Sequence, residues 1–435
     1  MSVGVRALEA KGDVPLFRLV LLHDAQSKAL ALLPADSLLD LVSIWKKTGR
    51  QLQPVRGEDA RRYFSQEALQ CPEGQARLLT LTLLLAPECA DFAQIQLTEP
   101  YSGLSFNVVQ RQLKKGVFCN FSRTVAEVIS RRQEGDDIAQ ITRAVERFTE
   151  LRIRQRLEDT LELPAFSATM QKIIELRSDP EASVNDLVPV VRLDPSLSAQ
   201  VMSWAASPYY AAPGHVSSIK DAVIRVLGFD LVINMALATA MGGMLKVPKE
   251  CPRGATPYWL QAVYNACFAE QLCKAMPESH NRPQPGLVYL AALLHNFGYL
   301  VLAHVFPPHF SMLSRYFEAN PHIALDIIEK QVLGVTREQI GSWLLESWKL
   351  PQPVTTAIRH QNNTQYEGEH DQYVQILYMA NRLLRQQGLS DGPLDDVPEE
   401  IYAALGLKEK KVAKMLRRLM RNDGDIRELT ALLGK

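Results

Sequence analysis

The sequence predicts a multi-domain α/β plus all-α protein, in which a mixed α/β domain precedes an all-helical domain. The chain has 435 residues, enough for two or three hydrophobic cores. Up to about residue 115, short apolar runs alternate with turn-forming residues, as in strands and hairpins. From Leu163 onward, apolar residues recur at helical spacing and signals for helix N-caps repeat. A fold boundary is therefore expected between these two regions.

Composition excludes several classes of partner. Lys+Arg and Asp+Glu number 48 each, so no global field attracts nucleic acid or an anionic membrane. The N-terminus lacks the apolar core of a signal peptide, and the most apolar segment, residues 229–245, is too short for a membrane span. Six cysteines without a Cys-x-x-Cys pair are typical of reduced, buried thiols. We expect a cytoplasmic protein with no membrane partner.

The first region contains several expected strands. LFRLVLL and ALALLP flank the turn-forming HDAQSK and predict a hairpin. Asp36 or Ser37 can then cap a helix through SLLDLVSIWKKTG that ends at Gly49. ARLLTLTLLLAP predicts one long strand, and AQIQLTEPYSGLSFNVV predicts a strand pair.

The remaining chain is expected to be helical. IAQITRAVERF holds fewer than three heptads, which favours a connecting helix on a neighbouring domain over a coiled coil. Pro195, Ser217 or Ser218, and Thr336 mark helix starts, and Gly228 marks a helix end. The basic segment at residues 408–421 predicts an amphipathic helix with a solvated outer face, with contact to a phosphate backbone as the alternative.

Residues 163–385 carry a resemblance to a known family. The run from LPAFSATMQKIIELRSDP to SSIKDAVIRVLGFDLVINMALA, then ALLHNFGYLVL, EKQVLGVTREQIGSWLLESWKLPQPVTTAIRHQ and YMANRLLR, follow one another in the order of the HD-related output domain, HDOD. That family resembles metal-dependent His-Asp phosphohydrolases that have lost part of their metal site, and it implies a role in bacterial signalling. The resemblance implies that the metal-site positions of such phosphohydrolases fall on Gln261, His295, Asn296, Arg337, His360 and Asn381.

These replacements imply a lost metal site. Catalysis by this fold requires imidazoles and carboxylates around the metal, and an amide cannot replace a carboxylate's charge. Only His295 and His360 remain as plausible ligands, so we expect no bound metal and no cofactor. We expect the mapped positions to converge on one pocket, with Arg337 turned to solvent or binding an anion. His295 itself can equally be a hydrogen-bonded core residue.

A looser resemblance covers about the first hundred residues. VLLHDAQSKALALLPADSLLDLVSIWKKTGRQLQPVRGEDARRYF resembles the YbaK-type prolyl-tRNA deacylase editing family. The lysine that this family uses near the first strand falls on Arg18, and its glycine-containing loop falls on Ser102 and Gly103. An arginine keeps the charge but not the compact donor of a lysine. The resemblance thus implies an editing-like cleft, with scaffolding as the alternative.

The predicted boundaries are 1–117 for the editing-like α/β domain, 118–162 for a helical linker, 163–385 for the HDOD domain, and 386–435 for a C-terminal helical extension. We expect a non-catalytic regulatory protein that binds an unidentified protein partner or a small ligand. The alternatives are residual deacylation or tRNA binding by the first domain, and weak metal-dependent phosphohydrolysis by the second.

Overall fold

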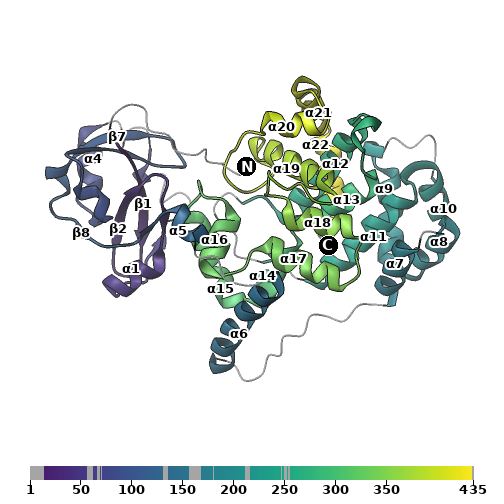
Figure 1. Cartoon of the computed structure of the whole chain (residues 1–435), viewed down its shortest axis with the longest axis horizontal. Coiled ribbons are helices and arrows are strands. Elements are labelled where there is room, and N and C mark those ends of the chain that lie inside the picture. Colours follow the sequence, from purple (N-terminus) through teal and green to yellow (C-terminus); the bar gives the residue numbers. More distant parts are fainter. Residues whose placement is uncertain are drawn as a thin grey trace.

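The computed structural model describes residues 14–55, 62–65, 69, 71–130, 136–155, 168–179, 181–210, 216–245, 247–248, 252 and 255–433. Two bodies lie side by side, a twisted sheet with short helices and a larger helical body (Figure 1). The predicted order of a mixed α/β region and a helical region is confirmed. The expected boundary at residues 162 and 163 lies outside the described residues.

The strands are β1 (Leu16–His23), β2 (Lys28–Pro34), β3 (Leu38–Leu39), β4 (Gln53–Pro54), β5 (Thr82–Leu85), β6 (Gln94–Thr98), β7 (Ser105–Val109), β8 (Val117–Phe118) and β9 (Ser122–Arg123). The main sheet has the order β7-β6-β1-β2-β5-β8, with β4 also paired to β1. The β1–β2 hairpin and the antiparallel β6–β7 pair confirm two predictions. β1 and β2 are buried along nearly their whole length, as expected for apolar central strands.

The sheet body also holds α1 (Leu41–Thr48), α4 (Pro72–Leu78), η1 (Pro87–Ala90), η2 (Gln110–Leu113) and α5 (Val125–Ser130). Two local predictions are wrong. α1 begins after Asp40, whose carboxylate accepts from the backbone N–H groups of Val42 and Ser43, while β3 pairs with β9. The expected long strand at ARLLTLTLLLAP is divided, because α4 takes its first residues and only Thr82–Leu85 joins the sheet. Gly49 ends α1 in the left-handed region, as predicted, with φ 70°.

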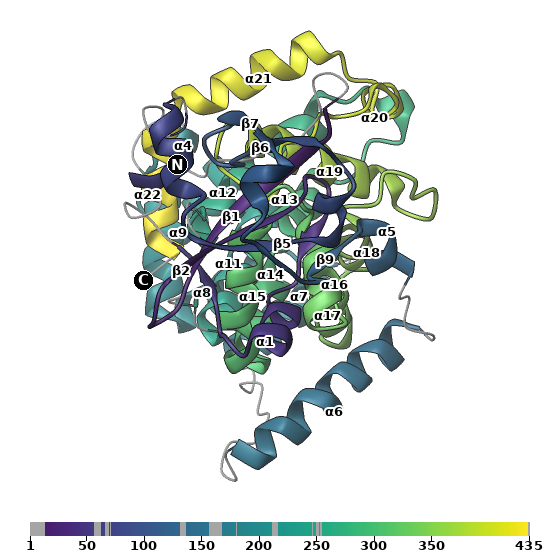
Figure 2. The same cartoon turned by 90° about the vertical axis from the view of Figure 1, so that its left-hand side faces the viewer.

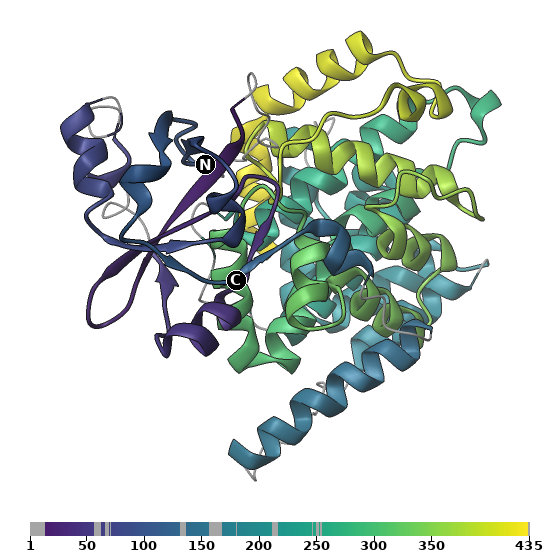
Figure 3. The same cartoon turned by 60° about the vertical axis from the view of Figure 1, so that its left-hand side comes forward.

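The predicted connecting helix is α6 (Asp137–Gln155), which projects from the molecule (Figures 2 and 3). Its first turn is fastened to the helical body. The carboxylate of Asp137 accepts from Gln339 Nε2 at 2.7 Å and from Arg359 Nη2 at 2.7 Å. α6 therefore meets the helical body at its N-terminal end.

The helical body comprises α7 (Ala168–Ser178), α8 (Val184–Leu193), α9 (Pro195–Ala206), η3 (Pro208–Tyr210), α10 (Ile219–Asp221), η4 (Ala222–Leu227), α11 (Phe229–Met244), α12 (Tyr258–Ala275), η5 (Glu278–His280), α13 (Pro285–Leu294), α14 (Phe297–Val305), α15 (Pro307–Ala319), α16 (Leu325–Val332), α17 (Arg337–Ser347), α18 (Gln352–His360), α19 (Asp371–Gln386), α20 (Glu399–Ala404), α21 (Glu409–Arg421) and α22 (Asp423–Leu433). The predicted boundaries at Pro195, Ser218, Gly228 and Thr336 are confirmed.

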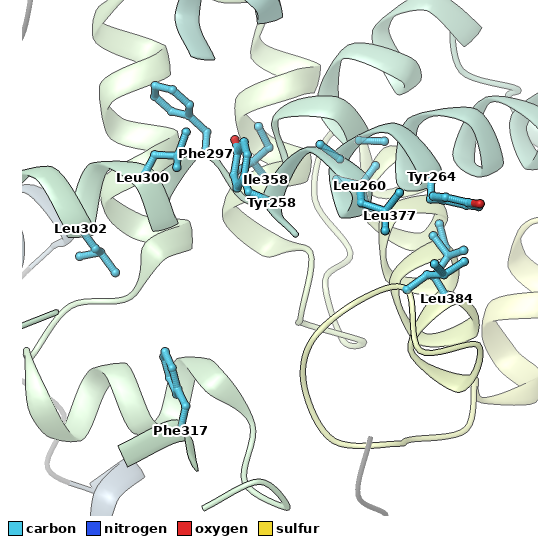
Figure 4. Close-up of a cluster of buried hydrophobic side chains, with 14 of the residues drawn as sticks. Tyr258, Leu260, Tyr264, Phe297, Leu300, Leu302, Phe317, Ile358, Leu377 and Leu384 are labelled. Carbon is cyan, nitrogen blue, oxygen red and sulfur yellow. The ribbon is translucent and has the colours of Figure 1, made fainter. Parts of the chain in front are cut away.

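The core of this body lies between α12, α13, α18 and α19. Figure 4 shows buried side chains that these and neighbouring helices contribute, among them Tyr258, Ile358 and Leu377. The described residues hold one helical stretch, Pro285–His304, that is long and apolar enough to cross a membrane by composition. Of its most apolar window, 89% is buried inside the protein, as expected for the central helix of a core.

Arg18 joins the two bodies. Its side chain is fully buried, and Nη1 donates to the carbonyl oxygen of Ala319 at 2.6 Å, at the C-terminal end of α15. Nη2 donates to Asn320 Oδ1 at 2.6 Å and to the carbonyl of Ser37 at 3.0 Å. Burial lowers the pKa of Arg18 to about 9, which leaves the guanidinium charged at neutral pH. A cation thus bonds one free carbonyl at the end of α15, where the helix dipole places partial negative charge.

Two further side chains of this region complete the junction. Asn320 accepts from the backbone N–H of Leu39 at 2.7 Å and donates to its carbonyl at 3.2 Å, as a neighbouring strand would. Tyr316 donates to the carboxylate of Asp40 at 2.7 Å and accepts from the N–H of Val42 at 3.1 Å. The end of α15 is therefore bonded to the edge of β3 and to the start of α1.

Replacing Asn320 by Ala is expected to weaken this junction by about 2 to 4 kcal/mol, because Arg18 and both backbone groups of Leu39 lose partners while buried. Hydrogen–deuterium exchange should then become faster in β1, β3 and the end of α15. Asn107→Ala, at an exposed position of β7, is the matched control. Equal exchange rates in the two variants would show that Asn320 does not hold the bodies together.

Candidate functional site

The site lies where the helical conformation is interrupted between α13 and α14. His295 follows the last residue of α13, and Asn296 precedes the first residue of α14. The ring Nδ1 of His295 lies 2.7 Å from the carbonyl oxygen of Ala292, within the last turn of α13. Burial lowers the pKa of His295 to about 4, so the imidazole is neutral at neutral pH. This histidine is hydrogen-bonded inside the core.

Two glycines bring α14 and α17 into backbone contact. A Cβ atom added to Gly298 would lie 1.8 Å from the carbonyl oxygen of Arg337. One added to Gly341 would lie 2.9 Å from the Cα of Gly298. Such distances leave no room for any side chain at Gly298. This close approach places the first residue of α17 beside Asn296.

Arg337 is buried in this crossing. Its Nε donates to Glu329 Oε1 at 2.5 Å, and its Nη1 donates to Asn296 Oδ1 at 2.8 Å. The guanidinium carbon also lies over the rings of Tyr299 and Phe317, 4.9 and 5.5 Å from their centroids. The expectation that Arg337 turns to solvent or binds an anion is wrong. Its partner is an acid of α16, which the turn at Gly334 brings back against α17.

Glu329 bonds to the backbone of α17 as well as to the Arg337 side chain. Its second oxygen accepts from the backbone N–H of Arg337 at 2.8 Å, in the first turn of α17, where the helix dipole favours an anion. Complete burial raises the pKa of this carboxyl, and the charge of Arg337 acts in the opposite direction. Two charge-assisted bonds to one carboxylate offset the desolvation of the pair.

A chain of amides continues from this pair across the helical body. Gln361 donates to the carbonyl of His295 at 2.7 Å and accepts from Asn381 Nδ2 at 3.0 Å. Asn381 in turn accepts from Asn265 of α12. Gln261 donates to the carboxylate of Asp391 at 2.6 Å. Polar side chains from four separate segments therefore form two hydrogen-bonded groups in the interior, one of Gln361, Asn381 and Asn265 and one of Gln261 and Asp391.

Only a small space remains between these groups, a cavity of about 30 Å³. Among the residues lining it are Gln261, His295, Asn296, Arg337 and Asn381. Five of the six positions predicted for the lost metal site thus lie around one cavity. His360 lies outside it, because its ring stacks on Tyr366 with centroids 4.2 Å apart. The next residue along the chain, Gln361, lines the cavity in its place.

Sequence reasoning missed several charged residues of the cavity. Glu338, the residue after Arg337, lines the cavity and accepts from Asn362 Nδ2 at 2.9 Å. Burial raises the pKa of Glu338 and of Asp391. Arg382 and Arg385 of α19 also line it. One of these contacts could have been expected from the sequence. A buried arginine requires an acidic partner, and Glu329 lies in the helix before Arg337.

Comparisons with known proteins match this architecture. Residues 163–364 match the family model described as HDOD domain. A crystal structure of a candidate signal-transduction protein from Marinobacter aquaeolei VT8 is 39% identical, with a TM-score of 0.85, and the alignment covers 100% of this chain and 97% of that one. Residues 163–364 of the chain form an HDOD domain.

Two more distant matches cover only part of the chain. An HDOD domain protein of unknown function from Geobacter sulfurreducens is 22% identical over 69% of this chain and 99% of its own, with a TM-score of 0.53. An uncharacterized protein from Treponema pallidum (strain Nichols) is 24% identical over 60% of this chain. The chain spans about half of that relative's length, 48%.

Within the described ranges, no three His, Cys, Asp or Glu side chains of the HDOD domain or the sheet body come together as a group that could hold a metal ion. Three acids line the cavity, Asp326, Glu338 and Asp391, but three arginines, Arg337, Arg382 and Arg385, line it with them and oppose the binding of a cation. The donor set around the HDOD cavity therefore does not fit a divalent cation.

The positions mapped to an editing-like cleft lie beside the HDOD domain. The guanidinium of Arg18 is used in the junction with α15. Ser102 and Gly103 form the exposed turn between β6 and β7, with φ 66° at Gly103. The preceding Tyr101 donates to the carbonyl of Glu318 at 2.8 Å. This end of the sheet is thus occupied by α15.

Replacing Arg337 by Met is expected to reduce the free energy of unfolding of the HDOD domain by about 3 to 5 kcal/mol, because Glu329 is left buried without a counter-charge. Unfolding in denaturant followed by helical circular dichroism measures this loss. A carboxyl whose folded pKa is raised binds a proton more tightly in the folded state. The variant should therefore lose further stability as the pH rises from about 4 through 8.

The double variant Arg337→Met/Glu329→Met is the control for this prediction. Removing both charges should restore most of the stability and abolish the additional pH dependence. A double variant no more stable than the single one would contradict the ion pair.

Proposed function

We propose that this chain is a non-catalytic regulatory protein whose HDOD domain acts as an interaction module. The HDOD domain at residues 163–364 and the similarity to a candidate signal-transduction protein support a regulatory role. The observation that carries the non-catalytic part is the buried ion pair of Arg337 with Glu329 beside Asn296. A fixed cation in the cavity repels a divalent metal, and its acid partner is already engaged.

The remaining donors do not supply the chemistry of a metal-dependent phosphohydrolase. Such catalysis requires a metal that activates water and neutralises the phosphate. Asn296 and Asn381 present neutral amides, and His295 is bonded to its own helix. We accordingly interpret the cavity as a degenerate HD site whose polar residues now stabilise the fold.

The size of the cavity favours a protein partner over a small ligand. A space of about 30 Å³ holds one or two water molecules, whereas small-molecule sites are usually several hundred Å³ or larger. A partner would therefore engage the surface of the HDOD domain or of the sheet body. An interaction screen with the full chain as bait would identify this partner.

For the sheet body we propose a scaffolding role in place of aminoacyl-tRNA editing. Arg18, at the position of the editing family's lysine, bonds to Ala319 and Asn320 of the HDOD domain. A buried guanidinium with these partners is not available to a substrate. The editing-like resemblance of the sequence then reflects the strand and helix pattern alone.

Metal content tests the proposal directly. The purified chain should hold no stoichiometric iron, manganese or zinc, and added metal should not promote phosphate release from phosphoesters, because carboxylate ligands are missing at Asn296 and Asn381. Elemental analysis and a phosphate-release assay measure both. One or more tightly bound ions per chain, lost in the His295→Ala variant, would overturn the non-catalytic assignment.

Deacylation tests the sheet body separately. The chain should not release amino acid from mischarged tRNA, since Arg18 is bonded within the protein. A rate of ~1 s⁻¹ or faster would establish an editing enzyme instead. The Arg18→Lys variant is informative, because a gain of activity in this variant alone would show that the cleft exists and lacks its lysine.

A further inference from the structure

Helix α21 crosses the outside of the helical body, in the part of the chain beyond the matched family residues (Figure 2). Val412, Leu416 and Leu419 are buried and form one stripe of the helix. Packing against α12 and α22 fixes the orientation of α21 through this apolar stripe. The opposite face is therefore held toward solvent.

That outer face is strongly basic. We name as the basic stripe the five exposed residues Lys410, Lys414, Arg417, Arg418 and Arg421. At 100° per residue these five fall within an arc of about 100°, centred opposite the buried stripe. At 1.5 Å per residue they extend over roughly 16 Å of the helix. The cations thus form one continuous line on a helix of fixed orientation.

The basic stripe is unfavourable for the helix itself. Lys410 and Lys414, Lys414 and Arg418, and Arg417 and Arg421 are like charges four residues apart, each pair costing a few tenths of a kcal/mol. Lys410 also lies in the first turn, where the helix dipole disfavours a cation. Among the described residues, no acid forms an ion pair with any of the five. Helix stability alone therefore does not account for the pattern.

Nearby acids leave the line of cations intact. Glu409, the only acid of α21, lies on the flank of the helix by its position in the turn. Asp423 at the start of α22 is engaged by Arg427 at 2.7 Å and also accepts from Tyr264. Neither Glu409 nor Asp423, both among the described residues, therefore forms an ion pair with the basic stripe.

We infer that the basic stripe of α21 is a docking surface for the phosphate backbone of a nucleic acid. Five cations can neutralise up to five backbone phosphates, and a line of about 16 Å is long enough to contact phosphates across a groove. Lysine and arginine side chains are the usual partners of backbone phosphates. The zero net charge of the chain leaves this local line as the source of attraction.

The geometry disfavours two other polyanions. A helix that lies on an anionic membrane inserts its apolar face between the lipids, but here Val412, Leu416 and Leu419 are buried in the protein. An interface with an acidic protein is usually centred on exposed aromatic or aliphatic side chains. The basic stripe contains only lysines and arginines, without such a centre.

The test measures binding of the full chain to a labelled DNA duplex and to a labelled single-stranded RNA, each of about 20 nucleotides per strand, between about 50 and 200 mM salt. Five phosphate contacts predict a slope of log affinity against log salt between about −4 and −5 for the duplex. Vesicles rich in phosphatidylserine and a polyglutamate peptide are measured in parallel.

Two triple variants locate the contact. Lys410→Gln/Lys414→Gln/Arg417→Gln should weaken duplex binding more than about tenfold at the lowest salt and reduce the slope by about 3. Lys46→Gln/Lys47→Gln/Lys114→Gln removes three exposed cations of the sheet body and should leave binding within about twofold of the parent. Circular dichroism confirms that both variants keep their helices.

Tighter binding to both nucleic acids than to vesicles or polyglutamate, lost only in the α21 variant, supports the inference. If neither the duplex nor the single-stranded RNA binds at the lowest salt concentration, the inference is wrong. An equal loss in the sheet-body variant would also overturn it, because it would show a diffuse attraction. Preferential binding of vesicles or polyglutamate would assign the basic stripe to a membrane or an acidic protein instead.

Discussion

The backbone contact between α14 and α17 is the constraint on which the interior of the HDOD domain depends. With no side chain at Gly298, the first turn of α17 lies directly against α14. Arg337 consequently reaches Asn296 from one side and Glu329 from the other. A methyl group at Gly298 would overlap the carbonyl of Arg337, so even alanine requires the helices to separate. The close packing of α14 on α17 thus explains why position 298, directly after His295, Asn296 and Phe297, is a glycine.

Much of the fold could be predicted because its signals are local. The β1–β2 hairpin, the helix end at Gly49 and the cap at Thr336 are each decided by a few neighbouring residues. The division of residues 72–85 into α4 and β5 was not predicted. A run of Leu and Thr is compatible with a helix or a strand, and tertiary contacts determine which one forms. Local sequence carries no information on those contacts.

The candidate site shows the same division. The resemblance placed five of six positions around one cavity, because the order of motifs fixes the order of helices. The pairing of Arg337 with Glu329 depends on how sharply the chain turns at Gly334. His360 is replaced by Gln361 at the cavity because the His360 ring stacks on Tyr366. Arg18 is the extreme case, since its bond to Ala319 joins residues 301 positions apart. A charge near the first strand suggested a ligand, whereas the structure uses it to complete a helix end.

The segment between Asn320 and Arg337 has a consequence for communication within the chain. At one end, Asn320 is bonded to the sheet body through Arg18 and Leu39. At the other end, Glu329 and Arg337 form the charged centre of the HDOD interior, and Phe317 of α15 lies against the same guanidinium. Both structures thus share one short stretch of polypeptide. The position of the sheet body and the position of the Glu329–Arg337 ion pair are therefore linked by the continuous chain from Asn320 to Arg337, so a displacement of one constrains the other.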